Sequence, residues 1–348
     1  MNADNAASRD TAAASACPFC GIHCDDAVAV DGRFLVGCPV ACRQRERAQN
    51  PQPRWDNKQL TAAEVFDLWR QAGTQDKVVS FGAAGMSLVQ RLLDDPMTGR
   101  YVFVGDRERS VDVLMKSLIR ESLVSATLGD VRQHADHVWL VGDIEAAFPR
   151  LGRWISPKAK IHKIKRLSES DLVRIANPRV DPLGSYLSIL IGPGALGDDP
   201  NDSAVLAEML LSRVRRHNAS ERSRVTLTWI DPIVSAASVY GWMTNRRLLT
   251  NRGEANIRIG SPVPGSLPVV MQLGGVDGGV QYSKGFLPAE IAGVNHDDVV
   301  TRGDGTITLP VRSEQLVDGD AGYEKTCIDW LREWALGGQT LGAGLPDA

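Results

Sequence analysis

Long hydrophobic runs and an excess of charge are both missing from this sequence of 348 residues. No apolar stretch approaches the roughly 18–20 residues that a helix needs to cross a bilayer, so we expect no membrane among its partners. The formal net charge of −3 gives no general electrostatic reason to expect nucleic acid as a partner. Residues 1–16 lack the basic start and the continuous apolar stretch of a signal peptide, and we interpret them as a disordered tail. Together these absences predict a cytoplasmic protein.

Cysteine is scarce and unevenly spread, because five of the six cysteines fall within 26 residues. The five are Cys17, Cys20, Cys24, Cys38 and Cys42. In a reducing compartment, such clustering indicates a metal site rather than disulfide bonds. Three cysteines in a short loop and a fourth farther along match the ligands of a [4Fe–4S] cluster, with Cys42 as the preferred fourth ligand and Cys38 as the alternative. Thiolates also bind zinc, and the spacing Cys38-x3-Cys42 would supply a second ligand pair, so a structural zinc site remains the other interpretation.

The composition is that of a globular protein, with 43% hydrophobic and 23% charged residues, and the length allows about two domains. Residues 17–50 form the predicted Cys-rich unit of iron–sulfur type. Within it, residues 27–30 and 33–36 flank the turn pair Asp31-Gly32 and predict an antiparallel hairpin. Residues 51–270 are the predicted α/β part. The glycine-rich residues 271–348 are expected to pack on it as hairpins or loops.

Short apolar strands alternate with helical segments after about residue 60. A helix is predicted over residues 61–73, because Thr61 and Glu64 have the spacing of a capping box and Gly73 suits the helix end. Buried strands are predicted at residues 77–81, 100–104, 137–142, 186–192 and 225–230. This alternation predicts mainly parallel sheets covered by helices, hence an α/β fold. Basic and apolar residues alternate over 158–166, which is typical of an edge strand protected by lysine.

Two pairs of glycines follow predicted strands, and the first pair is a candidate phosphate-binding loop. Gly82 and Gly85 precede a helical segment, where a loop can hold a phosphate at the helix N-terminus. Without a full G-x-G-x-x-G motif or a P-loop lysine, a plain strand–helix turn is favoured there. Gly192 and Gly194 follow the apolar run at residues 187–191.

Three segments together carry a family resemblance: CPFCGIHCDD (17–26), VACRQ (40–44) and TLGDVRQHADHVWLVGDIEAAFPRLGRW (127–154). In this order and spacing they resemble the B-type subunit of formylmethanofuran dehydrogenase, a relative of the molybdopterin oxidoreductases. The likeness covers about residues 17–200. It implies a molybdopterin-oxidoreductase-like fold. It also implies that Gly82, Gly85, Gly192 and Gly194 belong to a vestigial pterin-binding region.

The sequence departs from this family at the position that carries the catalytic metal. In dehydrogenase members, a cysteine or selenocysteine in the loop after the first sheet strand ligates molybdenum or tungsten. The corresponding residues 82–90 contain no cysteine, and Leu88 is the nearest counterpart. Because a leucine side chain cannot ligate a metal, we expect neither molybdopterin nor tungstopterin and assign no catalytic residue.

A bacterial branch of the family fits this loss. There, a formyltransferase/hydrolase complex moves a formyl group from tetrahydromethanopterin to a methanofuran-type carrier and hydrolyses it to formate during formaldehyde oxidation. The resemblance implies that this chain is the non-redox B-type subunit of such a complex. It would have a structural role, with the other subunits as its partners and any [4Fe–4S] cluster as a structural staple. The alternatives are a catalytic molybdenum or tungsten dehydrogenase subunit and a zinc-stapled α/β scaffold.

Overall fold

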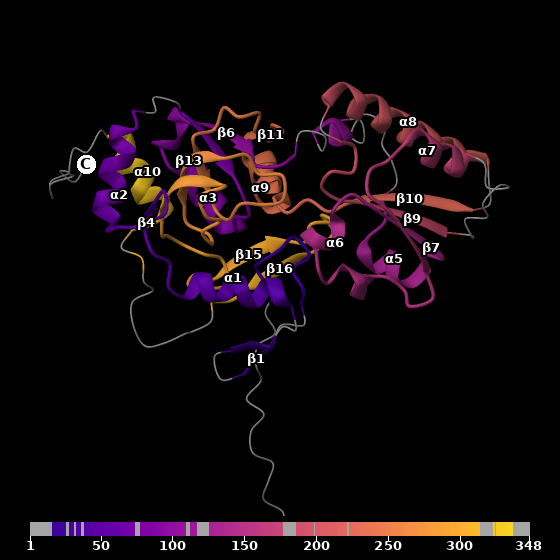
Figure 1. The fold of residues 1–348 in the computed structure, drawn as a ribbon, viewed down its shortest axis with the longest axis horizontal. Helices are drawn as coiled ribbons and strands as arrows, with labels where there is room; N and C mark the ends of the chain where they lie inside the picture. Colours follow the sequence, from indigo (N-terminus) through magenta and orange to yellow (C-terminus); the bar gives the residue numbers. More distant parts are fainter. Residues whose placement is uncertain are drawn as a thin grey trace, which may run out of the picture.

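Two separate β-sheets divide the molecule into two lobes that lie side by side (Figure 1). The computed structural model describes residues 16–25, 28–30, 33–35, 38–73, 77–108, 112–116, 125–176, 186–197, 199–220, 223–313, 323 and 325–336. The large lobe holds an eight-stranded sheet and the small lobe a four-stranded sheet. The small lobe is an insertion, because its strands follow β6 (Val102–Gly105) and precede α9 (Val234–Thr244) of the large lobe.

The sheet of the large lobe is parallel except at one edge, where two short strands pair antiparallel. Its order is β11-β6-β5-β12-β13-β14-β3-β4. The strands besides β6 are β11 (Leu249–Thr250), β5 (Val78–Phe81), β12 (Ile257–Ile259), β13 (Val269–Leu273), β14 (Ser283–Leu287), β3 (Arg54–Trp55) and β4 (Lys58–Gln59). The helices that share its core, besides α9, are α2 (Ala62–Gln71), α3 (Met86–Asp94) and α10 (Cys327–Ala335). Trp69 of α2 stacks on Trp334 of α10 with ring centroids 5.2 Å apart, which joins these two helices.

The sheet of the small lobe is entirely parallel, in the order β10-β9-β7-β8. Its strands are β10 (Arg224–Trp229), β9 (Tyr186–Ile191), β7 (His137–Val141) and β8 (Lys160–Ile164). The helices that cover it include α5 (Leu128–His134), α6 (Ile144–Ala147), α7 (Glu169–Ala176) and α8 (Pro200–Ser220). Helices α7 and α8 lie on one face and α5 and α6 on the other (Figure 1), so the central strand β7 is buried along its whole length. Burial on both faces explains the nearly continuous apolar runs of these strands.

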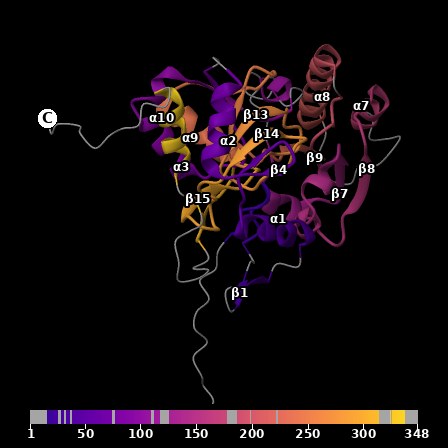
Figure 2. The ribbon, with the colours of Figure 1, turned by 60° about the vertical axis from the view of Figure 1, so that its left-hand side comes forward.

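Two small hairpins and a helix complete the molecule. Strands β1 (Val28–Val30) and β2 (Arg33–Leu35) pair antiparallel, as predicted from the turn pair between them. Helix α1 (Pro39–Gln49) lies beneath the two lobes in both views (Figures 1 and 2). Strands β15 (Asp298–Thr301) and β16 (Thr308–Val311) form the second antiparallel pair. Two short 3-10 helices lie at Thr98–Arg100 and Leu151–Trp154.

The mixed α/β architecture with parallel sheets, predicted from the alternation of strands and helices, is confirmed. The predicted capping box is present, because the Thr61 hydroxyl accepts the Glu64 N–H and the Glu64 carboxylate accepts the Thr61 N–H. The predicted boundary at residue 270 lies inside β13, which belongs to the large sheet together with β14. Here the parallel strands are joined by loops without a helix, so the strand–helix alternation that marks parallel pairing is missing from the sequence.

Of the helices that the structure describes, none has the length and apolar character that a bilayer crossing demands.

Candidate functional site

The first cysteines lie in a tight loop at the junction of the two lobes. The loop is closed by a 2.8 Å hydrogen bond from the Cys17 N–H to the Cys24 carbonyl, and the His23 N–H donates to the Cys20 carbonyl. His23 has φ 43°, a left-handed conformation that is uncommon for residues other than glycine and that forms part of this sharp turn. Gly21 permits close packing, because a Cβ there would lie 2.9 Å from Cα of Pro232. The loop therefore contacts the segment that follows β10.

Four thiols are electrostatic neighbours in this region. Burial raises the pKa of the Cys17 thiol, and the nearby thiols of Cys20, Cys24 and Cys38 raise it further. Burial also raises the pKa of Cys20 to about 12, with added contributions from Cys24 and Cys38. Cys38 is buried at the N-cap of α1, whereas Cys42 is exposed one turn later. The structure thus groups Cys38, rather than the preferred candidate Cys42, with the loop thiols.

Within the described part of the chain, these thiols do not surround a common centre. Among the residues described, no three side chains of histidine, cysteine, aspartate or glutamate converge as metal ligands. The donor set itself is soft and sulfur-rich, which suits an iron–sulfur cluster or zinc. Thiols with raised pKa values are protonated near neutral pH, and binding of a metal would release those protons. The chemistry of the donors fits a thiolate-bound group.

The glycines after β5 lead into a helix N-terminus that the chain fills with its own carboxylate. The buried Asp298, from β15, accepts the Ser87 N–H at 2.7 Å and the Leu88 N–H at 3.4 Å. Gly85 is the N-cap of α3, and a Cβ there would lie 2.1 Å from the Asp298 carboxylate. A Cβ at Gly82 would likewise lie 2.1 Å from the Ser261 carbonyl oxygen. These glycines are needed for close internal packing.

The second glycine pair is also held within the protein. A Cβ at Gly192 would lie 2.6 Å from Cβ of Ile144 in α6. Gly194 has φ 74°, and its N–H donates to the Glu108 carboxylate at 2.8 Å. The hydrogen bond to Glu108 ties this loop of the small lobe to the segment that follows β6.

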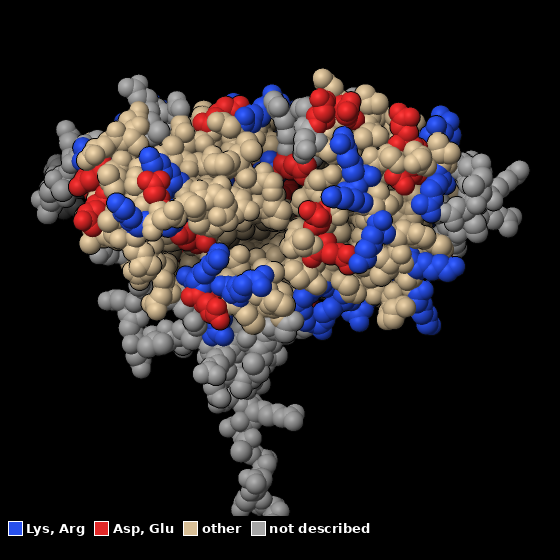
Figure 3. Space-filling model, viewed as in Figure 1, with Lys and Arg blue, Asp and Glu red and all other residues tan. Residues whose placement is uncertain are grey.

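A cleft of about 450 Å³ lies between the two lobes, and Figure 3 shows the hollow above α1. Residues next to both glycine pairs, Ala83 and Pro193, line it from opposite lobes. Its walls are rich in aromatic and proline side chains, with Arg47 of α1 as the cation of the lining. The size and mixed character of the lining are those of a small-molecule site.

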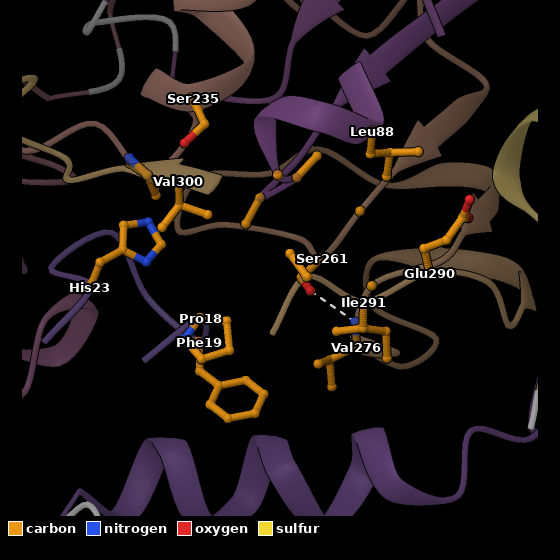
Figure 4. Close-up of a pocket in the computed structure, with 17 residues that line it drawn as sticks. Pro18, Phe19, His23, Leu88, Ser235, Ser261, Val276, Glu290, Ile291 and Val300 are labelled. Atoms are coloured by element: carbon orange, nitrogen blue, oxygen red, sulfur yellow. Dashed lines mark hydrogen bonds between the residues drawn. The ribbon is translucent and has the colours of Figure 1, made fainter. Parts of the chain in front are cut away.

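A second, much smaller pocket of about 30 Å³ adjoins the start of α3 (Figure 4). Leu88 is buried and lines this pocket. His23 and Glu290 lie on opposite sides of it. Burial lowers the pKa of the His23 imidazole to about 4, so this ring is neutral at physiological pH. A volume of this size is about that of one water molecule.

Sequence reasoning missed the contacts that hold the lobes and the cysteine loop together. The loop between β15 and β16 contacts both the cysteine loop and the segment after β10. The Gly303 N–H donates to the Gly21 carbonyl at 2.6 Å, and the Gly303 carbonyl accepts the Asp231 N–H. In the same loop, Asp304 accepts the Leu128 N–H at the start of α5 at 3.0 Å. The Arg302 guanidinium lies 4.5 Å from the ring centroid of Trp154 in the small lobe.

A buried ion pair fastens the two segments that connect the lobes. Arg107 follows β6 and Asp231 follows β10, and their side chains are 2.9 Å apart with exposures of 7% and 8%. Asp231 also accepts the Ile233 N–H at 3.0 Å. The sequence signal for this pair was a basic and an acidic residue, each just after a predicted strand. Because the two residues are far apart along the chain, the sequence did not indicate that they pair.

The fold is similar to a chain of a solved enzyme complex. The X-ray crystal structure of the formyltransferase/hydrolase complex (FhcABCD) from Methylorubrum extorquens, in complex with methylofuran, contains a chain that matches with a TM-score of 0.51. The match covers 81% of this chain and 97% of that one, at 14% sequence identity. At this identity the likeness shows a shared fold. No protein-family model matches the sequence, and no curated protein matches it.

Proposed function

We propose that this chain is the non-redox B-type subunit of a formyltransferase/hydrolase complex in methanofuran-linked one-carbon metabolism. Its role is to organise the complex, while other subunits transfer the formyl group to the carrier and hydrolyse it to formate. Two separate lines of support lead here. The cysteine segment and residues 127–154 resemble the B-type subunit of formylmethanofuran dehydrogenase. The fold, over 81% of the chain, is similar to a chain of a solved complex of this kind.

The residues at the N-terminus of α3 are the observation that supports a subunit without a redox centre of its own. Where dehydrogenase relatives place a metal-ligating cysteine, this chain has the buried, apolar Leu88. The N–H groups at the start of a helix can bind an anionic cofactor. At the start of α3, the N–H groups of Ser87 and Leu88 instead donate to the Asp298 carboxylate. A pterin-bound metal would therefore have neither a protein ligand at residue 88 nor an open helix end beside it.

The cysteine loop is proposed to hold a [4Fe–4S] cluster through Cys17, Cys20, Cys24 and Cys38. When bound, the cluster would act as a structural staple and not as a catalyst. It would fasten the loop and the first turn of α1 to the small lobe, whose core residues already contact Cys17, Cys24 and Cys38. Zinc on the same thiolates is the alternative, and it would carry no acid-labile sulfide.

The test is to co-express the tagged chain with the other three subunits of such a complex and to purify the assembly anaerobically. We expect a stable hetero-oligomer by size-exclusion chromatography with light scattering, and molybdenum and tungsten below about one-tenth of a mole per mole. Formyl-carrier hydrolysis should require the assembly but no redox dye. Stoichiometric tungsten or molybdenum, together with formate-linked dye reduction, would instead establish the catalytic dehydrogenase subunit.

A further inference from the structure

One stretch of the small lobe concentrates positive charge in a chain that is negative overall. Residues 150–166 contain seven Lys and Arg and no Asp or Glu, while the whole chain has a net charge of −3. The seven are Arg150, Arg153, Lys158, Lys160, Lys163, Lys165 and Arg166, and all but Arg150 are exposed. Figure 3 shows basic side chains gathered along the lower and outer margin of this lobe. The strip makes a local positive field, since screening confines such fields to about 8 Å at physiological salt.

The strip is built around an exposed sheet edge. Within the described residues, strand β8 (Lys160–Ile164) pairs with β7 alone, and it is exposed or half-buried at every position. The opposite edge strand, β10, is by contrast mostly buried. An exposed edge presents backbone N–H and C=O groups to another chain. Ile161 at this edge is 48% exposed, so an apolar contact is available between the lysines.

We propose that β8 receives an acidic, extended segment of a partner polypeptide, which adds to the sheet as a further strand. The backbone of the segment would bond to the free edge of β8. Its carboxylates would pair with Lys160, Lys165 and Lys158, which belong to no ion pair of the described residues. Lys163 is already bonded to Glu145 at 2.7 Å and is not needed. The same lysines discourage pairing with neutral or basic edges, which gives the site specificity as well as attraction.

A peptide fits this surface better than a nucleic acid does. The remainder of the chain carries an excess of negative charge, which would repel a long polyanion. An edge strand offers peptide-like hydrogen bonds at a spacing that a sugar–phosphate backbone does not match. The proposal goes beyond the function proposed above, because it names the surface and the chemistry of one partner and does not depend on the reaction of the complex.

The experiment measures fluorescence anisotropy of a labelled twelve-residue peptide of alternating Glu and Val, titrated with the full-length protein. The matched variants are Lys160→Glu with Lys165→Glu, and Lys58→Glu with Arg100→Glu. Both pairs change the charge equally, and the second pair lies on the large lobe. We expect at least tenfold weaker binding for the first variant and a change of less than twofold for the second.

A peptide of the same sequence with alternate backbone nitrogens methylated tests strand addition, and should also bind at least tenfold more weakly. Circular dichroism establishes that both variants are folded. Absence of binding by the wild-type protein, equal loss in both variants, or unchanged binding of the methylated peptide would overturn the proposal. Tighter binding of a fifteen-nucleotide single-stranded DNA than of the acidic peptide would overturn it in favour of a nucleic-acid surface.

Discussion

The N–H of Ser87 donates a 2.7 Å hydrogen bond to the Asp298 carboxylate, which lies 211 positions later in the chain. This bond places a negative charge from β15 at the positive end of α3, where charge and helix dipole attract each other. The same hairpin supplies Asp304 to the Leu128 N–H at the start of α5. One short hairpin thus caps a helix in each lobe with its own carboxylates, and so links the two lobes.

Removing the Asp298 carboxylate should destabilise the protein measurably. In Asp298→Ala, Ser87 loses its acceptor in a partly buried setting, and we expect a loss of about 1–2 kcal/mol in the free energy of unfolding. Urea denaturation followed by tryptophan fluorescence measures it. The matched control is Asp297→Ala, because Asp297 bonds Ser313 at an exposed position. Equal losses in both variants would show that the position at the helix end has no special importance.

The ion pair between Arg107 and Asp231 should be the most sensitive contact between the lobes. Asp231→Asn leaves a buried guanidinium without its counter-charge, and we expect a loss of about 3–5 kcal/mol. The exposed pair Lys163–Glu145, with exposures of 66% and 55%, is the natural comparison. Glu145→Gln should cost less than about 1 kcal/mol. Thermal denaturation of both variants at one protein concentration measures the difference, and a cost for Asp231→Asn no larger than that for Glu145→Gln would contradict the assignment.

The sequence predicts those features of the fold that depend on near neighbours. The capping box at Thr61 and Glu64 spans three positions, and the burial of β7 on both faces is visible as an apolar run. The Ser87–Asp298 contact could not be predicted from the sequence, because the two residues are far apart along the chain and an isolated aspartate has many possible roles. The parallel neighbours β12 and β13 were missed for a related reason, since no helix separates them.

The candidate site was likewise predicted only in part from the sequence. Clustering of the cysteines was evident from spacing, and the structure places Cys17, Cys20 and Cys24 in one loop. The sequence favoured Cys42 over Cys38 as the fourth ligand, but the choice depends on where α1 begins, which the spacing does not show. Cys38 is the N-cap and faces inward, which puts Cys42 a turn later and exposed.

Arg302 should couple the hairpin to the small lobe through Trp154. Its guanidinium lies 4.5 Å from the Trp154 ring and bonds Asp304 through two nitrogens at 3.1 Å. A double-mutant cycle with Arg302→Lys and Trp154→Leu should give a coupling energy of about 0.5–2 kcal/mol in unfolding experiments. The pair Lys284 and Trp55 lies within the large lobe and serves as the control for a cation near an indole ring. Coupling below about 0.3 kcal/mol would mean that Arg302 acts only within its own loop.

The two candidate fourth ligands can be separated by metal content. Cys38 is buried and its thiol raises the pKa values of Cys17, Cys20 and Cys24, whereas Cys42 is exposed on α1. Because a [4Fe–4S] cluster needs four thiolates near one centre, Cys38→Ser should lower iron and acid-labile sulfide at least twofold in anaerobically purified protein. Cys42→Ser, with the same chemical change one turn away, should leave both at the wild-type level. Loss of iron in Cys42→Ser alone would restore the ligand set favoured by spacing, and zinc without sulfide in the wild type would replace the cluster with a zinc site.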